Sequence, residues 1–169
     1  SKQAKRFDPE QVYALANRLS YPLTPDQFTA VRDILEDMAS EKVMYRLVQG
    51  DVGCGKTLVA SLALYACVLS GHQGAIMAPT EILARQHAEP LKQLFAGLPI
   101  RIDALYSSLP QAEKKEVLRR LAQGETDLVA GTHALFQKEV QFQKLGLVVA
   151  DEQHRFGVAQ RRALKEKGE

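Results

Sequence analysis

The chain has 169 residues, of which 46% are hydrophobic and 25% are charged, the usage of an ordinary globular domain. This length predicts one domain with a sizeable core and is short for two domains of usual size. Lysine and arginine total 22 and aspartate and glutamate 20, so the net charge of +2 excludes a strongly basic, histone-like binder but allows a local basic patch. The longest apolar stretch is shorter than the roughly 20 residues of a membrane span. Two cysteines favour a reducing cytosol over a disulfide framework.

Two helices are expected before the first strand. Asp8-Pro9 is a favourable N-cap and first-turn pair for a helix ending near residue 19. Thr24 and Gln27 fit a capping box that starts a second helix, which should end near residue 39. The apolar residues that this second helix should bury are Phe28, Val31, Ile34 and Leu35.

From residue 44 onward, short apolar runs alternate with helical segments. Strands are expected over 44–48, 75–78, 100–105, 128–130 and 145–150. Helices are expected over 56–69, 81–95, 111–123 and 158–167, with Pro90 kinking or splitting the second of them. Strands that alternate with helices predict an α/β fold, a doubly wound parallel sheet with helices on both faces. Side chains expected on the solvent-exposed face of a helix are Lys114, Lys115, Arg119 and Arg120. Residues expected at the surface or next to a helix cap are His72, His87 and His133.

A glycine-rich loop follows the first expected strand. The string Gly50-Asp51-Val52-Gly53-Cys54-Gly55-Lys56-Thr57 fits G-x-x-x-x-G-K-[ST], with a strand before it and a helix after it. Glycines let backbone N–H groups curl around phosphate oxygens, and the helix N-terminus favours an anion. We therefore expect Lys56 to reach the β- and γ-phosphates of ATP and Thr57 to hold Mg²⁺. Cys54 occupies a variable position of this loop and is interpreted as a spacer.

Two carboxylates follow the last expected strand, which is almost entirely apolar. Asp151 and Glu152 stand where open α/β sheets bind ligands. Asp151 suits Mg²⁺, directly or through water, and Glu152 suits activation of the attacking water. The alternative is an acidic surface turn, which the phosphate loop upstream makes the weaker interpretation.

Four separated strings occur in order along the chain. They are Gln49-Gly50-Asp51-Val52-Gly53, Met77-Ala78-Pro79-Thr80-Glu81-Ile82-Leu83-Ala84 with Gln86-His87, Gly131-Thr132-His133-Ala134-Leu135, and Asp151-Glu152-Gln153-His154-Arg155-Phe156-Gly157-Val158 with Gln160-Arg161. With them the chain resembles the RecG family, bacterial ATP-dependent branch-migrating DNA helicases of superfamily 2. The resemblance covers residues 23–168 and implies the first RecA-like lobe, a P-loop NTPase.

Two alternatives to this interpretation remain. The related transcription-repair coupling translocase typically has Glu where this chain has Gln153. An inert nucleotide-binding module is the other alternative.

The resemblance also implies roles for further residues. Gln27 matches the glutamine that recognises adenine, a role compatible with its place in the capping box. Thr80 and Thr132 match DNA-contact positions, with plain helix capping as the alternative. Gln153 and His154 match residues that sense the γ-phosphate. Residues expected to contact DNA after the acidic pair are Arg155, Phe156 and Arg161, with a core Phe and solvated Arg as the alternative.

The same resemblance implies a larger protein. Residues 1–20 would be a linker and helix from the side of a wedge domain, and 21–169 an ATP-binding lobe that stops before a Ser-Ala-Thr strand. An exposed sheet edge beside Met44–Val48, open to self-association, is then expected. The whole protein would remodel stalled forks and branched DNA in repair and recombination in the bacterial cytoplasm, with a second RecA-like lobe and the wedge domain as partners in cis. Alone, the chain is expected to bind Mg-nucleotide weakly with little hydrolysis, since the second lobe supplies the arginine finger.

Overall fold

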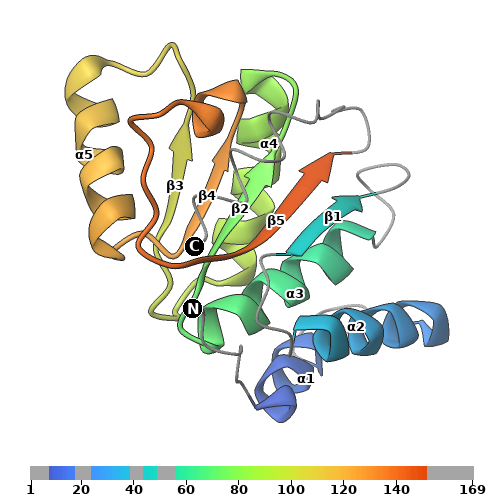
Figure 1. Cartoon of the computed structure of the whole chain (residues 1–169). Coiled ribbons are helices and arrows are strands. Elements are labelled where there is room, and N and C mark those ends of the chain that lie inside the picture. Colours follow the sequence, from blue (N-terminus) through green and yellow to red (C-terminus); the bar gives the residue numbers. More distant parts are fainter. Residues whose placement is uncertain (1–7, 18–23, 39–43, 49–55, 152–169) are drawn as a thin grey trace.

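The structure of the chain, a computed structural model, describes residues 8–17, 24–38, 44–48 and 56–151 (Figure 1). The helices of this part are α1 (Pro9–Asn17), α2 (Pro25–Met38), α3 (Lys56–Leu69), α4 (Glu81–Leu94), α5 (Gln111–Gln123) and the 3₁₀ helix η1 (His133–Phe136). The strands are β1 (Met44–Val48), β2 (Gln73–Met77), β3 (Ile102–Leu105), β4 (Leu128–Gly131) and β5 (Leu145–Asp151). The expected helix over 158–167 lies outside the described residues.

The strands form one parallel sheet in the order β1-β5-β2-β4-β3. Within the described part of the sheet β1 and β3 are the outer strands, so the expected edge beside Met44–Val48 belongs to an outer strand. Self-association through that edge stays a prediction. Because all the strands run parallel, their carboxyl ends lie at one edge of the sheet, which Figure 1 shows for the arrowheads of β1, β2 and β5.

Successive side chains of the inner strands enter two separate cores, one on each face of the sheet. In β5, Leu147 and Val149 belong to the first core and Val148, between them, to the second. Helices α3 and α4 cover the first core, whereas α5 and the segment 134–142 cover the second. Strands buried on both faces explain the nearly continuous apolar runs in the sequence. The expected α/β fold with helices on both faces is confirmed.

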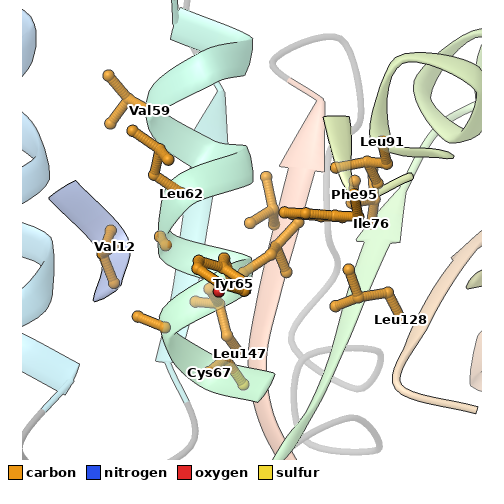
Figure 2. Close-up of a cluster of buried hydrophobic side chains, with 14 of the residues drawn as sticks. Val12, Val59, Leu62, Tyr65, Cys67, Ile76, Leu91, Phe95, Leu128 and Leu147 are labelled. Carbon is orange, nitrogen blue, oxygen red and sulfur yellow. The ribbon is translucent and has the colours of Figure 1, made fainter. Parts of the chain in front are cut away.

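The first core lies between one face of the sheet and the helices α3 and α4, which both cover that face (Figure 2). The rings of Tyr65 from α3 and Phe95 next to α4 stack with centroids 5.5 Å apart. Ile76 of β2 belongs to the same core, and Val12 of α1 packs against α3 on the side away from β2 (Figure 2). Helix α3 is thus buried on nearly all sides, as its almost uniformly apolar sequence predicts.

One expectation for α2 is wrong. Val31 is buried as predicted, but Phe28 is 45% exposed. Its ring stacks on Tyr13 of α1, with centroids 5.1 Å apart, so Phe28 contacts a neighbouring surface helix instead of the core. Residues 34 and 35 belong to α2, and the placement of their side chains is not described.

Helix α4 continues through Pro90, so the proline does not split it. Pro90 lies on the exposed side of the helix, where water can bind the Gln86 carbonyl that lacks a helical donor. Two of the histidines expected at the surface or next to a helix cap are buried: His72 and His87 are each 4% exposed, whereas His133 is exposed.

Two cations of α5 also depart from the expected solvent-facing placement. The side chain of Arg120 is only 14% exposed and binds Asp103 of β3, with Nε 3.0 Å and Nη2 3.1 Å from its carboxylate oxygens. The side chain of Lys114 is equally covered, and its Nζ lies 3.9 Å from Glu139. Arg119 and Lys115 are exposed as predicted. No helix in the described ranges is long and apolar enough to cross a membrane.

Candidate nucleotide-binding site and nucleic-acid edge

The carboxyl edge of the sheet gathers the segments that carry the predicted site residues. Val48 at the end of β1 pairs with Asp151 at the end of β5. Gly131 at the end of β4 pairs with Met77 on one side and Leu105 on the other. The ends of neighbouring strands therefore lie close together in space although they are far apart in sequence.

The phosphate-loop residues Gly50, Gly53, Cys54 and Gly55 lie outside the described residues, between the end of β1 and the start of α3. Lys56 and Thr57 are the first two residues of α3. A strand followed by a short loop and the N-terminus of a long helix provides N–H groups and a positive helix end for an anion. This arrangement fits a bound triphosphate, with Lys56 and Thr57 at the helix end that would face it.

Asp151 is the last residue of β5, which is buried along 145–150. The apolar strand thus ends at this residue, whose backbone lies beside Val48 at the end of β1. Glu152, Gln153 and His154 lie outside the described residues. Among the residues that the structure describes, no group of three or more His, Cys, Asp or Glu side chains could hold a metal ion by itself.

Gln27 lies in the first turn of α2 and is half-buried. Its Oε1 accepts a hydrogen bond from the backbone N–H of Thr24 over 2.9 Å, and Thr24 Oγ1 accepts one from the N–H of Gln27 over 3.2 Å. The capping box is therefore confirmed, and adenine recognition by Gln27 stays a prediction.

The two predicted DNA-contact threonines differ in exposure. Thr80 is the exposed N-cap of α4, and its Oγ1 accepts a hydrogen bond from the N–H of Leu83 over 3.2 Å. Thr132 is 7% exposed and precedes η1 without a side-chain cap. Its backbone N–H donates to the carbonyl of Leu105 over 3.3 Å. Capping thus accounts for the threonine at position 80 but not for the one at position 132, and DNA contact by either stays a prediction. The other candidate DNA contacts, Arg155, Phe156 and Arg161, lie outside the described residues.

Sequence reasoning missed a link between the segments after β2 and β3. The carboxylate of Glu81 accepts two hydrogen bonds from Ser108, from its N–H over 3.2 Å and from its hydroxyl over 2.6 Å. One helical turn later, the guanidinium of Arg85 lies 4.8 Å from the ring centroid of Tyr106. The four-residue spacing of Glu81 and Arg85 places both on one helix face. Only the sheet topology, not any local pattern, brings their partners there.

Asp103 and Asp127 form a polar network near the amino ends of β3 and β4. Burial raises the pKa of Asp103, but hydrogen bonds from Arg120 and Thr126 and the charges of Arg120 and Arg101 outweigh it, so this pKa is lowered. Burial raises the pKa of Asp127, and the hydrogen bond from the Arg101 N–H offsets only part of that rise. This network stabilises the outer strand β3 at the end of the sheet opposite the candidate site.

Comparison with known proteins matches residues 24–168 to the DEAD/DEAH box helicase family. The chain is 52% identical to the ATP-dependent DNA helicase RecG of Bacillus subtilis over 165 residues, which is 98% of this chain and 24% of that protein. It is 53% identical to RecG of Streptococcus pneumoniae, over 96% of this chain and 24% of that protein. The chain thus spans about a quarter of the length of these relatives.

Two solved structures resemble the fold. The structure of RecG bound to a three-way DNA junction matches with a TM-score of 0.83 and 42% identity, over 92% of this chain and 21% of that one. A hypothetical ATP-dependent RNA helicase from Sulfolobus tokodaii matches with a TM-score of 0.60 and 14% identity, over 94% of this chain and 54% of that one, and shows the fold alone. The chain belongs to the DEAD/DEAH box helicase family.

Proposed function

We propose that the chain is the ATP-binding lobe of an ATP-dependent DNA helicase or translocase that acts on forked and branched DNA in repair and recombination. The observation that carries this proposal is that the phosphate loop, the acidic motif and Thr80 all follow strands that end at one edge of the sheet. The identity to the RecG helicases of two bacteria, and the three-way junction bound by a third similar protein, support DNA as the substrate. We place the activity in the cytoplasm, where bacterial DNA is processed.

In this proposal the nucleotide lies on the N-terminus of α3. Lys56 binds the β- and γ-phosphates, and Gln27 recognises adenine. Thr57 and Asp151 would hold Mg²⁺, which neutralises phosphate charge when it is bound. Glu152 orients the attacking water. Backbone N–H groups of Gly50, Gly53, Cys54 and Gly55 bind phosphate oxygens, and Gln153 and His154 sense the γ-phosphate.

The DNA strand lies along the same edge in this proposal, next to the nucleotide. Thr80 binds a backbone phosphate, and the segments around Thr132 and 155–161 extend the contact. A second RecA-like lobe and a wedge domain act in cis on the branched substrate. Without an arginine finger from a second lobe, hydrolysis by these 169 residues alone is expected to be slow, by about 10³–10⁵-fold.

A nucleotide titration of the chain tests the phosphate site. Lys56→Ala should weaken binding of a fluorescent ATP analogue in the presence of Mg²⁺ by about tenfold or more, because it removes a charge-assisted contact to phosphate. Lys115→Ala, on the exposed face of α5, is the matched control and should bind like the parent. Equal affinity of Lys56→Ala and parent would favour an inert module instead.

The DNA part of the proposal needs the protein as its gene encodes it. ATP hydrolysis should rise on addition of single-stranded, forked or three-way junction DNA, and most on branched substrates. Stimulation by RNA of the same lengths, or none by DNA, would overturn the assignment.

A further inference from the structure

Three segments at the carboxyl edge are joined in a ring of hydrogen bonds. The N–H of Ala78, after β2, donates to the carbonyl of Gly131 over 2.9 Å. The N–H of Thr132, after β4, donates to the carbonyl of Leu105 over 3.3 Å. Two of the three connections are therefore backbone bonds that continue the ladder beyond the strand ends.

The third connection is made by a side chain. The carboxylate of Glu81 at the start of α4 accepts both the N–H and the hydroxyl of Ser108, three residues after β3. It closes the ring between the segment that begins α4 and the segment that leaves β3. The other two connections are hydrogen bonds between backbone groups, which a side-chain substitution does not remove. A substitution of Glu81 can therefore break the third connection without changing the strands.

Arg85, on the same face of α4 as Glu81, makes a second contact with the segment after β3. Its guanidinium lies over the ring of Tyr106, which is 8% exposed, at 4.8 Å from the centroid. A cation over an aromatic face contributes modest attraction at a partly exposed site. The 106–108 segment is thus attached to α4 at two points, one turn apart on the helix.

We propose that Glu81 is a positioning residue for the DNA strand: by holding Ser108 it fixes the segment after β3 relative to Thr80. This inference rests on the proposed function, since it assumes that a strand lies on this edge. Thr80 itself caps α4, and residue 81 is the next residue along the chain. Loss of the Glu81–Ser108 hydrogen bonds should therefore release the 106–108 segment from its position next to Thr80. It should leave the phosphate site on α3 intact.

The test is the dependence of ATP hydrolysis on DNA concentration, in the protein as its gene encodes it. Glu81→Ala should raise the KM for DNA by about tenfold, since it removes two hydrogen bonds to a charged group, with kcat at saturating DNA and the KM for ATP unchanged. Glu81→Gln should recover most of the loss, because its amide oxygen still accepts from the Ser108 N–H and its amide nitrogen can donate to the hydroxyl.

Two further variants separate positioning from simple stabilisation. Ser108→Ala should give a smaller rise in the KM for DNA, and the double variant with Glu81→Ala should be no worse than Glu81→Ala alone, since the two residues act as one unit. Glu89→Ala is the control, because Glu89 is an exposed residue of the same helix, 3.9 Å from Lys92. It should leave all three kinetic constants unchanged.

The outcomes are distinguishable. If DNA does not stimulate the parent, the proposed function fails and this inference fails with it. If DNA stimulates the parent but Glu81→Ala leaves the KM for DNA unchanged, or lowers only the melting temperature, the inference alone is overturned. Additive effects of Glu81→Ala and Ser108→Ala would also overturn it. If Glu81→Ala does not fold, Glu81→Gln and Ser108→Ala carry the test, and an unchanged KM for DNA in Ser108→Ala then decides against the inference.

Discussion

Thr24 and Gln27 bind each other reciprocally at the start of α2, each through its own backbone N–H and the other's side-chain oxygen. The carboxamide of Gln27 caps the helix with its oxygen. Its Nε2 amide is the group that would donate to N7 of adenine. One side chain thus combines a confirmed structural role with a proposed recognition role, and the donor Nε2 serves only the second.

The variant Gln27→Glu should separate helix capping from adenine recognition. A carboxylate at this position still accepts from the Thr24 N–H, so Gln27→Glu should keep the thermal stability of the chain close to that of the parent. It cannot donate to N7, so the affinity of the chain for ATP should fall by about tenfold. Thermal unfolding and titrations with ATP measure the two effects.

Thr24→Ala is the complementary variant. It should cost about 0.5–2 kcal/mol of stability, the usual effect of losing an N-cap, and leave the affinity for ATP intact. An unchanged affinity for ATP in Gln27→Glu would contradict adenine recognition and leave Gln27 as a capping residue only.

The sequence was sufficient for elements whose cause is local. Helix α3 has the predicted bounds because its residues are apolar on nearly every side, and α5 because of its amphipathic pattern and Gly124, which adopts φ 78° at the C-cap. The capping box at Thr24 was equally readable, since it depends on two residues three positions apart. The glycine-rich string and the acidic pair were recognisable for the same reason.

Features that depend on a distant partner were not predictable. The pattern of α5 places Arg120 at the polar side of the helix, but only the sheet topology brings Asp103 of β3 beside it. Phe28 fits an apolar stripe, yet Tyr13 of α1 offers a stacking partner outside the core. The Glu81–Ser108 link joins residues 27 positions apart, and no periodicity indicates it.

The side chain of Gln73 is a buried polar group that makes several hydrogen bonds, and its contribution to stability can be measured. Its Nε2 donates to the carbonyls of Leu121 over 3.0 Å and Thr126 over 2.8 Å, and its Oε1 accepts from the N–H of Lys144 over 2.8 Å. The side chain thus joins the end of α5 to the segments that precede β4 and β5. The residue is 4% exposed, so water cannot replace these partners without opening the core.

Gln73→Leu should therefore lower the free energy of unfolding by about 2–4 kcal/mol, since it removes the donor to the Thr126 carbonyl and the acceptor of the Lys144 N–H. The Leu121 carbonyl keeps hydrogen bonds from the backbone N–H groups of Gly124 and Gln143. Urea unfolding followed by circular dichroism measures this loss. Gln111→Ala, at an exposed position of α5, should change stability by less than about 0.5 kcal/mol. If the free energy of unfolding falls no more in Gln73→Leu than in the control, water or a shifted backbone forms hydrogen bonds with the former partners of Gln73.

The polar network at β3 predicts a pH dependence with a definite sign. The pKa of Asp103 is lowered in the folded chain, because contacts with Arg120, Thr126 and Arg101 outweigh the effect of burial. At acid pH the unfolded chain therefore binds this proton more readily than the folded chain does. The contribution of Asp103 to stability is complete above the unfolded value of about 4 and is lost as pH falls through the lower folded value.

Asp127 acts in the opposite direction. Its pKa is raised by burial, so its contribution favours the folded state below the unfolded value of about 4 and is lost as pH rises through the folded value. Asp127→Asn keeps an oxygen that can accept from the Arg101 N–H, which now lies 2.8 Å from the carboxylate. This variant should match or exceed the stability of the parent at neutral pH, where the parent carries a desolvated charge.

Asp103→Asn should instead lose about 1–3 kcal/mol at neutral pH, because Arg120 and Arg101 lose a charged partner. The difference from the parent should narrow as pH falls below about 4, where protonation removes the same charge from the parent. Urea midpoints measured between about pH 3 and pH 7 test both aspartates. Stability curves of parent and Asp103→Asn that stay parallel across this range would show that packing, and not the charge of Asp103, holds β3 to α5.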